Sequence, residues 1–268
     1  MSAVRKPWRR VPFSHPVRSR TLVLCYHAFS ESWPAPLAVT PDELRKQLSW
    51  LVRAGYRGAT FREAATTEPS GLTLVVTFDD AFLSVLTFAY PILEELGLPG
   101  TVFVVTDFAQ SSEPLAWEGI EQWQGAYDDE LRGMSWQQLR VLADAGWEIG
   151  SHTRTHPRLT QVDDVLLARE LRDSREACEQ ALDRPCHSLA YPYGDADERV
   201  CAAAVAAGYT SAAIEDLGPV APMAWPRIGI WRNDSMHRFR LKVSPTLCWA
   251  RAVLGQARLA AAAHAAHL

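Results

Sequence analysis

Two adjacent carboxylates, Asp79 and Asp80, end an apolar run in the stretch VVTFDDAF. Like charges held side by side repel each other, so such a pair at a strand end indicates a partner or a chemical use. One structural explanation is a helix N-cap followed by an acid that interacts favourably with the helix dipole, but it does not explain both acids. A glycosidase site is disfavoured, because its two acids must flank the scissile bond from opposite sides.

Two histidines four residues apart, His152 and His156, lie in the stretch GSHTRTHPRL. Pro157 disfavours helical backbone at His156, so we predict a loop that leaves a strand and bends both imidazoles inward. Two neutral imidazoles and one carboxylate suit a divalent metal ion such as zinc, with positions left open for water and substrate. The alternative for this short pattern alone is a pair of surface histidines. An acid pair at another strand end favours the metal.

The elements that must position these side chains alternate between strands and helices along the chain. In a parallel β/α fold the carboxyl ends of the strands form one face, where sites are built. Four groups of unusual residues follow predicted strands and are therefore expected to converge: His27 after 21–26, Asp79 and Asp80 after 72–78, His152 and His156 after 147–151, and Tyr191 to Gly194 after 187–190.

Most of the predicted strands are continuous apolar runs, which is typical of a parallel sheet covered by helices. Further strands are predicted at 101–105, 209–214 and 227–231, and helices at 43–54, 81–96, 135–145, 163–182 and 195–207. We predict an α/β fold, a single distorted (β/α) barrel with about seven parallel strands, rather than a doubly wound open sheet. The expected organisation is a basic N-terminal tail (1–20), the barrel (21–244) and an Ala-rich, helical tail (245–268).

Composition narrows the class of protein. The chain has 268 residues and is 48% hydrophobic, enough for one sizeable core. Its formal net charge is -4, without a dominant charged block, so nothing indicates nucleic acid as a partner. The cysteines are five, irregularly spaced and without a CxxC, which is typical of reduced thiols. The sequence contains no run of 18 apolar residues, so we predict no membrane-spanning helix.

The first 20 residues carry six Lys or Arg, no acid and no apolar core of a secretory signal. One interpretation is a disordered basic tail. The alternative is contact with an anionic membrane surface. We therefore expect a cytoplasmic protein, with peripheral attachment to the inner membrane face as the alternative.

The motifs TFDD, HTRTH in the form H-[ST]-x-x-H, and YPYG, in this order, resemble the polysaccharide deacetylases of carbohydrate esterase family four. The resemblance covers residues 21–231. It implies a distorted (β/α) barrel with a divalent metal ion, often zinc. It also implies an enzyme that removes N- or O-acetyl groups from sugars by hydrolysis. The roles it implies are a catalytic base at Asp79, metal ligands at Asp80, His152 and His156, and an oxyanion-hole N–H at Tyr193.

This sequence departs from the family pattern at one arginine. Many members have an arginine three residues before the tyrosine, where it orients the catalytic base, but this chain has Ala190. Arg227, in the stretch WPRIGIW, is the candidate replacement. The alternative for Arg227 is a surface residue at the start of a strand.

A second departure concerns the general acid, because no L-x-H motif follows RIGIW. The first and last strands of a closed barrel are neighbours, so a permuted chain could supply the histidine from the first strand, LVLCYH. This start resembles the permuted members of the family, and it makes His27 the candidate acid and His237 the second candidate. The alternative for His27 is a buried structural histidine.

Residues 107–133 contain three aromatic side chains that suit a platform for sugar rings, Trp117, Trp123 and Tyr127. A lid with its own small core is the alternative.

Together these observations predict a metal-dependent hydrolase that removes acetyl groups, above all N-acetyl, from a sugar, oligosaccharide or polysaccharide. One alternative is a hydrolase of a non-sugar amide or imide on the same fold, and another is a non-catalytic sugar-binding homologue. An iron oxygenase with two histidines and one carboxylate is disfavoured. Its acid normally lies two residues after the first histidine, whereas here the acid precedes both.

Overall fold

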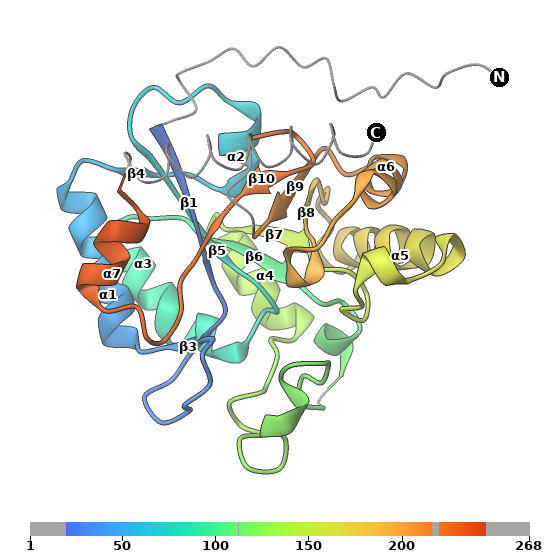
Figure 1. Cartoon of the computed structure of the whole chain (residues 1–268), viewed down its shortest axis with the longest axis horizontal. Coiled ribbons are helices and arrows are strands. Elements are labelled where there is room, and N and C mark those ends of the chain that lie inside the picture. Colours follow the sequence, from blue (N-terminus) through green and yellow to red (C-terminus); the bar gives the residue numbers. More distant parts are fainter. Residues whose placement is uncertain (1–19, 112, 216–219, 245–268) are drawn as a thin grey trace, which may run out of the picture.

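The computed structural model describes residues 20–111, 113–215 and 220–244. Within these ranges, parallel strands form a nearly closed barrel-like sheet in the order β10-β9-β8-β7-β6-β5-β1-β11, with β4 paired to β5 (Figure 1). The strands are β1 (Thr21–Tyr26), β4 (Arg57–Gly58), β5 (Thr73–Phe78), β6 (Thr101–Val104), β7 (Glu148–Ser151), β8 (Ser188–Ala190), β9 (Ser211–Ile214), β10 (Trp225–Pro226) and β11 (Ile228–Gly229). The predicted distorted (β/α) barrel is confirmed.

One short segment closes the sheet. Strand β10 pairs with β9 and strand β11 pairs with β1, and a single residue, Arg227, separates the two strands along the chain. The prediction placed one strand at 227–231, whereas the structure has these two shorter strands. Residues 225–226 thus pair with one edge of the sheet and residues 228–229 with the other, and Arg227 lies where the pairing changes edge.

Alternation along β1 shows how the strands separate two cores. Val23 points into the barrel, where it packs with Val75 of β5 and Phe103 of β6. Its neighbours Leu22 and Leu24 belong to the larger core between the sheet and the helices. Successive side chains of a strand point to opposite faces, so apolar residues at every position are buried on both sides.

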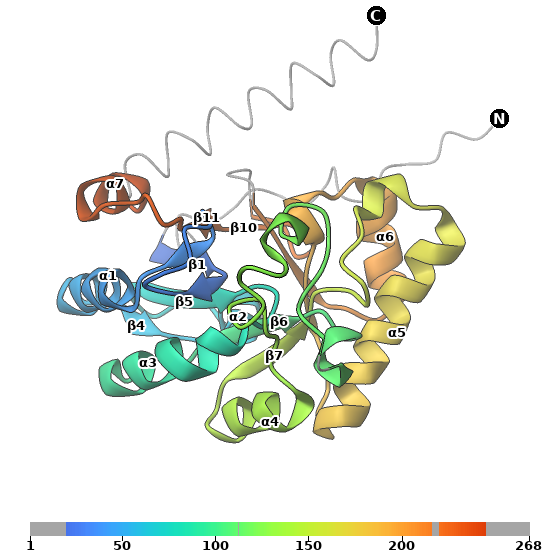
Figure 2. The same ribbon diagram turned by 90° about the horizontal axis from the view of Figure 1, so that it is seen from below.

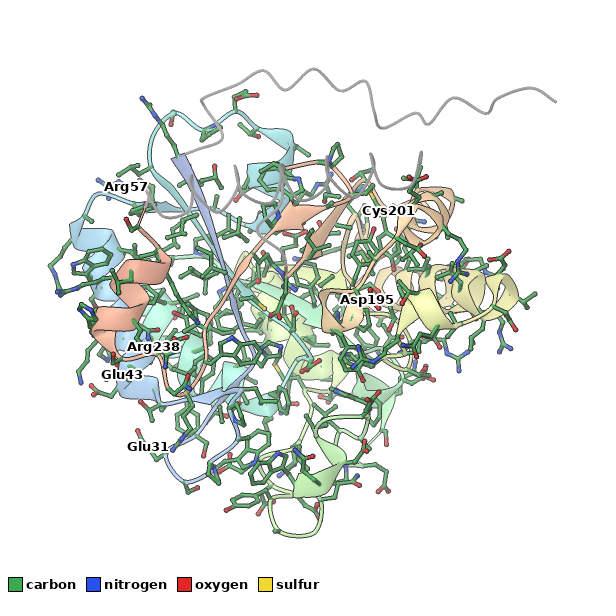
Figure 3. All side chains as sticks on the ribbon, viewed as in Figure 1. Glu31, Glu43, Arg57, Asp195, Cys201 and Arg238 are labelled. Carbon is green, nitrogen blue, oxygen red and sulfur yellow. The ribbon has the colours of Figure 1, made fainter. Side chains whose placement is uncertain are left out.

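Helices cover the outside of the barrel, with α1 and α3 beside β1 and β5 and with α5 and α6 on the other side (Figures 1 and 2). Exposed charged side chains such as Arg57 and Arg238 point outward from this layer (Figure 3). The helices are α1 (Pro41–Arg53), α2 (Phe61–Thr66), α3 (Tyr90–Leu96), α4 (Trp136–Asp144), α5 (Asp164–Leu182), α6 (Glu198–Ala206) and α7 (Met236–Lys242). Among the described residues, no helix combines the length and apolar character that crossing a membrane requires.

Hydroxyl and carboxylate caps start several of these helices, as the sequence indicates. Thr40 Oγ1 accepts from the Glu43 N–H before α1, and Ser135 and Gln138 form a reciprocal capping box before α4. The helix predicted at 81–96 begins later, as a π-helical turn at Val85–Ala89 followed by α3, and Pro91 lies at the junction. Helix α6 begins at Glu198 rather than 195, after its Asp197 cap.

A lid formed by residues 107–111 and 113–134 packs over the carboxyl ends of the strands with the segment 28–39. This segment carries the short parallel pair β2 (Ala28–Phe29) and β3 (Ala38–Val39). Fully buried Trp33 lies at the centre, with Trp123 and Tyr127 at ring-centroid distances of 6.1 and 6.4 Å. The lid therefore has its own small core, as one of the two sequence interpretations predicted. The predicted tails fall almost entirely at residues 1–19 and 245–268, outside the described ranges.

Candidate metal centre and active site

The backbone separates the two adjacent acids. The Asp79 N–H still donates to the Tyr26 carbonyl of β1 at 3.0 Å, so Asp79 continues the strand. Asp80 and Ala81 then adopt left-handed φ values of 68° and 56°, which few non-glycine residues do. The chain thus leaves the strand at Asp80, and the two buried carboxylates point to different partners.

Asp80 faces both predicted histidine ligands. Its Oδ1 lies 3.5 Å from Nε2 of His152 and 3.5 Å from Nε2 of His156, and all three side chains are buried. No hydrogen bond reaches Asp80 Oδ1 among the described residues, which is costly for a buried carboxylate oxygen unless a cation binds it. Two nitrogens and one oxygen converging on one point fit a divalent ion such as zinc and leave coordination positions open.

Both imidazoles are prepared to bind a metal ion. The His152 Nδ1–H donates to the Ala190 carbonyl at 2.8 Å, which leaves the Nε2 lone pair facing Asp80. Burial lowers the pKa of His152, and burial together with His152 lowers the pKa of His156 further. The neutral, metal-binding form of each ring is therefore favoured.

The loop that carries the histidines depends on a buried glutamate that sequence reasoning missed. Glu170 of α5 accepts from the backbone N–H groups of Arg154 and Thr155, each at 2.9 Å, and from Thr155 Oγ1 at 2.8 Å. These bonds hold a turn in which His156 has a left-handed φ of 63°. Glu170 lies on the apolar stripe of its helix, three residues after Leu167, and an acid in such a stripe is the signal that could have identified it.

Asp79 binds Arg227 instead of the histidines. Arg227 donates from its two terminal nitrogens to Oδ1 and Oδ2 of Asp79, at 2.6 Å each, and also contacts Thr77 Oγ1 at 3.1 Å. Burial by itself raises the pKa of Asp79, but Arg227 outweighs it and holds that pKa well below its usual range. Asp80 has no such partner, so burial and the neighbouring Asp79 raise its pKa well above the usual value.

Tyr193 lies beside the histidines in a short 3-10 turn, Pro192–Gly194, with a left-handed φ of 60°. Its ring contacts His156 edge to face at 4.7 Å, and its hydroxyl donates to the Glu118 carbonyl of the lid at 3.1 Å. The guanidinium of Arg158 lies over the face of the Tyr193 ring, with its Cζ 3.9 Å from the ring centroid. The side chain is thus engaged by its neighbours, and its backbone N–H is the group that the resemblance points to.

The lid also reaches the metal centre through Trp117, whose importance the sequence did not reveal. Its indole stacks on the His156 ring with the centroids 4.4 Å apart and the planes at 27°. Phe108 supports the indole from its edge at 5.3 Å. Of the three lid aromatics, Trp117 stacks on a candidate metal ligand, whereas the rings of Trp123 and Tyr127 pack on Trp33 and on each other.

His27 lies directly after β1, next to Asp79. His27, Cys25, Asp79 and Glu215 form a second group whose ligand atoms all lie within 4.8 Å of one another. The His27 ring stacks on Trp231 at 5.4 Å, and Trp231 in turn donates its backbone N–H to buried Asp234 at 2.9 Å. The second candidate acid, His237, is exposed on α7 and belongs to neither group.

Glu215 is a further site residue that the sequence analysis did not single out. It follows β9 directly, at the same face as the other strand ends. A side chain at Gly194, where φ is 66°, would meet the Glu215 backbone N and Cβ at 2.8 Å, so glycine permits this close approach. The signal in the sequence is its position, since it is the first polar residue after a predicted strand.

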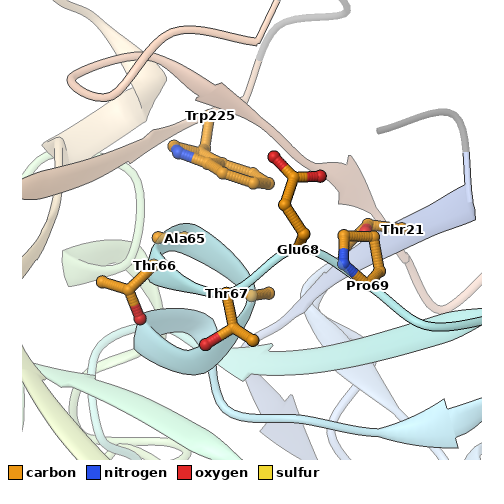
Figure 4. A pocket seen from close by; sticks show the side chains of 8 residues that line it. Thr21, Ala65, Thr66, Thr67, Glu68, Pro69 and Trp225 are labelled. Atoms are coloured by element: carbon orange, nitrogen blue, oxygen red, sulfur yellow. The ribbon is translucent and has the colours of Figure 1, made fainter. Parts of the chain in front are cut away.

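A small recess of about 40 Å³ lies between Thr21, Trp225 and the segment 64–69 (Figure 4). Thr21 begins β1, so the recess lies at the end of the barrel opposite the metal centre. It is far smaller than a ligand pocket, which typically encloses roughly 300–1,000 Å³. The acids and histidines at the carboxyl ends of the strands therefore remain the candidate site.

A barrel that brings an aspartate and two histidines together at its strand ends has a candidate site for a divalent metal ion, and sequence comparison supplies the family. The polysaccharide deacetylase family profile matches residues 66–212. The chain belongs to the polysaccharide deacetylase family.

Curated relatives in sequence are distant. The Bacillus subtilis protein that bears the name "Putative polysaccharide deacetylase YxkH" is 24% identical over 229 residues, which is 83% of this chain and 71% of the relative. The poly-β-1,6-N-acetyl-D-glucosamine N-deacetylase of Staphylococcus epidermidis is 21% identical over 170 residues, or 59% of this chain and 54% of the relative. The chain thus spans about half the length of the second relative.

Solved structures share the fold. The deacetylase PplD of Streptococcus pyogenes, solved with acetate, superposes with a TM-score of 0.69 at 23% identity and covers 84% of this chain and 98% of its own. IcaB from Ammonifex degensii superposes with a TM-score of 0.66 at 22% identity, over 85% and 97% of the two chains. At these identities the likeness describes the architecture.

Proposed function

We propose that this protein is a metal-dependent hydrolase that removes N-acetyl groups from a sugar, oligosaccharide or polysaccharide. The observation that carries the proposal is the division of the acid pair, with Asp79 held ionised by Arg227 and Asp80 directed at His152 and His156. A general base and a metal site thus lie on adjacent residues. Family membership and the N-deacetylase named among the relatives support the carbohydrate substrate.

Asp80, His152 and His156 would hold the ion, for which zinc fits the donor set. When bound, such an ion polarises the acetyl carbonyl and lowers the pKa of a water molecule. Asp79 accepts the proton of the attacking water, and its pairing with Arg227 keeps it ionised for this step. The Tyr193 backbone N–H donates to the oxyanion that develops on the acetyl group.

His27 is the proposed general acid, which gives a proton to the leaving amine of the sugar. It lies within 4.8 Å of Asp79, and strand β1 that delivers it is paired with β11, so the first strand occupies the place beside the last. The amine then leaves neutral rather than as an unstable anion. A start of this kind resembles the permuted members of the family and accounts for the missing C-terminal L-x-H motif.

The test measures acetate released from oligomers of N-acetylglucosamine in β-1,4 and β-1,6 linkage, from O-acetylated sugars and from simple amides and cyclic imides. We expect N-acetyl oligomers to be hydrolysed, the activity to vanish with a chelator, and zinc to restore it. Turnover of the amides or imides alone would replace the sugar by a non-sugar substrate on the same site. No turnover of any substrate by zinc-loaded protein would reject the proposal.

Asp79→Asn separates the base from the metal site. We expect it to lose roughly 10²–10⁴-fold in turnover while it still binds one metal ion per chain, because Asn cannot accept the proton. Asp144→Asn is the matched control and should keep full activity. Asp144 is an exposed acid at the end of α4, where it pairs with Arg184.

A further inference from the structure

A second set of metal-ligating atoms lies beside the candidate metal centre. Cys25 comes from β1, His27 follows β1, Glu215 follows β9, and Asp79 follows β5. Their sulfur, nitrogen and oxygen atoms all lie within 4.8 Å of one another, although the residues come from three separate strand ends. The Cys25 thiol donates to Asp79 Oδ2 at 3.5 Å. Three different donor types thus converge in a space in which the proposed reaction uses only Asp79 and His27.

Two of these donors have buried atoms without hydrogen bonds. Among the described residues, nothing bonds to His27 Nδ1 or Glu215 Oε1, and both atoms are shielded from solvent. A buried polar atom without a partner is costly, and native structures leave few of them. Each atom is therefore an unsatisfied polar atom enclosed by protein rather than by bulk water.

The charges of the group also leave room for a cation. Asp79 and Glu215 bring two negative charges. Arg227 donates from both terminal nitrogens to Asp79, at 2.6 Å each. Among the described residues, no cationic side chain forms an ion pair with Glu215. A metal ion or a proton on His27 can each supply positive charge here. The two exclude each other when both need the same nitrogen of the His27 ring.

We propose that Cys25, His27 and Glu215 form a second cation site, completed by Asp79, which takes zinc or another thiophilic divalent ion and inhibits the enzyme when filled. The binding claim stands on these residues alone, whereas the inhibition rests on the proposed function of His27. One sulfur, one nitrogen and carboxylate oxygens favour zinc, cobalt and cadmium over magnesium or calcium.

Binding at this site requires the Cys25 thiol to lose its proton. Burial, Asp79 and Glu215 all raise the pKa of Cys25, with Arg227 opposing them. The S–H bond breaks, the proton passes to solvent, and a sulfur–metal bond forms without any change of oxidation state. An ion at this site must also compete with Arg227 for the Asp79 oxygens, whereas Asp80 Oδ1 has no hydrogen-bond partner among the described residues, so the second site fills at a higher metal concentration than the site at Asp80.

The consequence is a two-phase response to metal. The first ion supports hydrolysis, while the second occupies the His27 nitrogen that otherwise carries the proton for the leaving amine. Excess zinc therefore lowers the rate in a way that depends on Cys25, even though Cys25 has no part in the reaction. Cys25→Ser keeps a hydroxyl donor toward Asp79 and removes the thiolate.

Binding is tested on the whole chain with cobalt, whose bond to a thiolate gives a near-ultraviolet charge-transfer band. We expect two ions per wild-type chain at high cobalt, with the band appearing only as the second ion binds. Cys25→Ser should bind one ion without the band. Cys201→Ser is the matched control, because Cys201 is a half-buried thiol on α6, away from β1, and should behave as the wild type (Figure 3). One ion in the wild type, or an unchanged band in Cys25→Ser, would overturn the proposal.

Inhibition is tested by acetate release across a zinc titration. We expect the wild-type rate to rise and then fall, and in Cys25→Ser and Glu215→Gln the falling phase should move to more than about tenfold higher zinc. A falling phase that stays in place in both variants would contradict the inhibitory site. If no substrate is turned over, the cobalt experiment still decides the binding, so failure of the proposed function and failure of this site give different results.

Discussion

Arg227 and Asp79 form a two-bond ion pair across the seam that closes the barrel, with both nitrogen–oxygen distances at 2.6 Å. Arg227 lies between β10 and β11, and Asp79 lies at the end of β5. The guanidinium also lies 5.5 Å from the Phe103 ring, and Phe103 shares its barrel-interior cluster with Ala190. Ala190 has a small side chain at the position where the family resemblance predicts an arginine, and Arg227 brings a guanidinium to Asp79 from the segment between β10 and β11.

Removal of Arg227 should destabilise the protein and impair Asp79 as the general base. Arg227→Ala leaves the buried Asp79 carboxylate without the positive charge that pairs with it, and breaking a buried pair in this way costs about 3–5 kcal/mol. Arg227→Lys keeps the charge but not the two parallel bonds, so we expect a smaller loss of stability. Urea unfolding and acetate release measure both effects.

The double variant Asp79→Asn with Arg227→Met provides the control for this pair. It removes both charges, so it should recover part of the stability lost in Arg227→Ala while it stays inactive. If Arg227→Ala unfolds at the same urea concentration as the wild type, the ion pair does not stabilise the barrel.

Metal binding should release a proton from Asp80 and none from the histidines. Burial and Asp79 raise the pKa of Asp80, so the metal-free acid keeps its proton above the ordinary value of about 3.9. Burial lowers the pKa of both histidines, so they are already neutral below the ordinary value of about 6.5. We therefore expect about one proton to be released per ion at a pH between these two ordinary values, decreasing as the pH rises through the pKa of Asp80.

Calorimetric titration of zinc in buffers of different ionisation enthalpy measures this release. Metal concentrations are kept low enough to fill the Asp80 site alone. Release of two or three protons in this pH range would mean that the histidines are charged in the metal-free protein, and no release there would mean that Asp80 is already ionised.

Much of this site could be predicted from sequence because its residues follow strands. The rule that parallel strands end on one face brings Asp79, Asp80, His152 and His156 together without any knowledge of loops. The departure of the chain from the strand at Asp80 has a simple physical basis, because successive strand residues would otherwise point Asp79 and Asp80 to opposite faces.

The remaining features depend on how the barrel closes and where the lid lies. Arg227 could be named only as a candidate, because its place in the seam follows from β10 and β11 pairing with opposite edges of the sheet. Trp117 reaches His156 through an irregular loop without periodicity, so no sequence pattern predicts the contact. Glu215 is brought near Asp79 by barrel curvature and by the absence of a side chain at Gly194.

Trp117 should tighten metal binding by holding His156 in place. Its indole stacks on the ring at 4.4 Å, so Trp117→Ala frees the imidazole to rotate, and we expect a loss of about 10–100-fold in zinc affinity. Trp117→Phe retains a stacking ring and should lose less. Competition with a coloured chelator measures the affinity.

Trp123→Ala is the matched control for the lid, because Trp123 packs on Trp33 in the lid core and not on His156. It should lower stability with little effect on zinc affinity. An equal loss of affinity in the Trp117 and Trp123 variants would assign the effect to the lid as a whole rather than to the stacked ring.

Tyr193 should contribute its backbone, not its hydroxyl, to the reaction. The hydroxyl donates to the Glu118 carbonyl, and burial is the largest cause that raises the pKa of Tyr193 to about 12, so it stays protonated throughout the working range. Tyr193→Phe loses one partly exposed hydrogen bond, typically about 0.5–1.5 kcal/mol, and should change turnover by less than about tenfold. Its pH–rate profile should superimpose on that of the wild type.

Tyr193→Gly separates the ring from the backbone. Glycine keeps the N–H and accepts the φ of 60° more readily, but it removes the edge contact with His156 at 4.7 Å. We therefore expect weaker zinc binding, with turnover of the zinc-saturated variant close to that of the wild type. A loss of 100-fold or more in Tyr193→Phe at saturating zinc would instead place the phenol in the reaction, because neither the backbone N–H nor the ring contact changes in that variant.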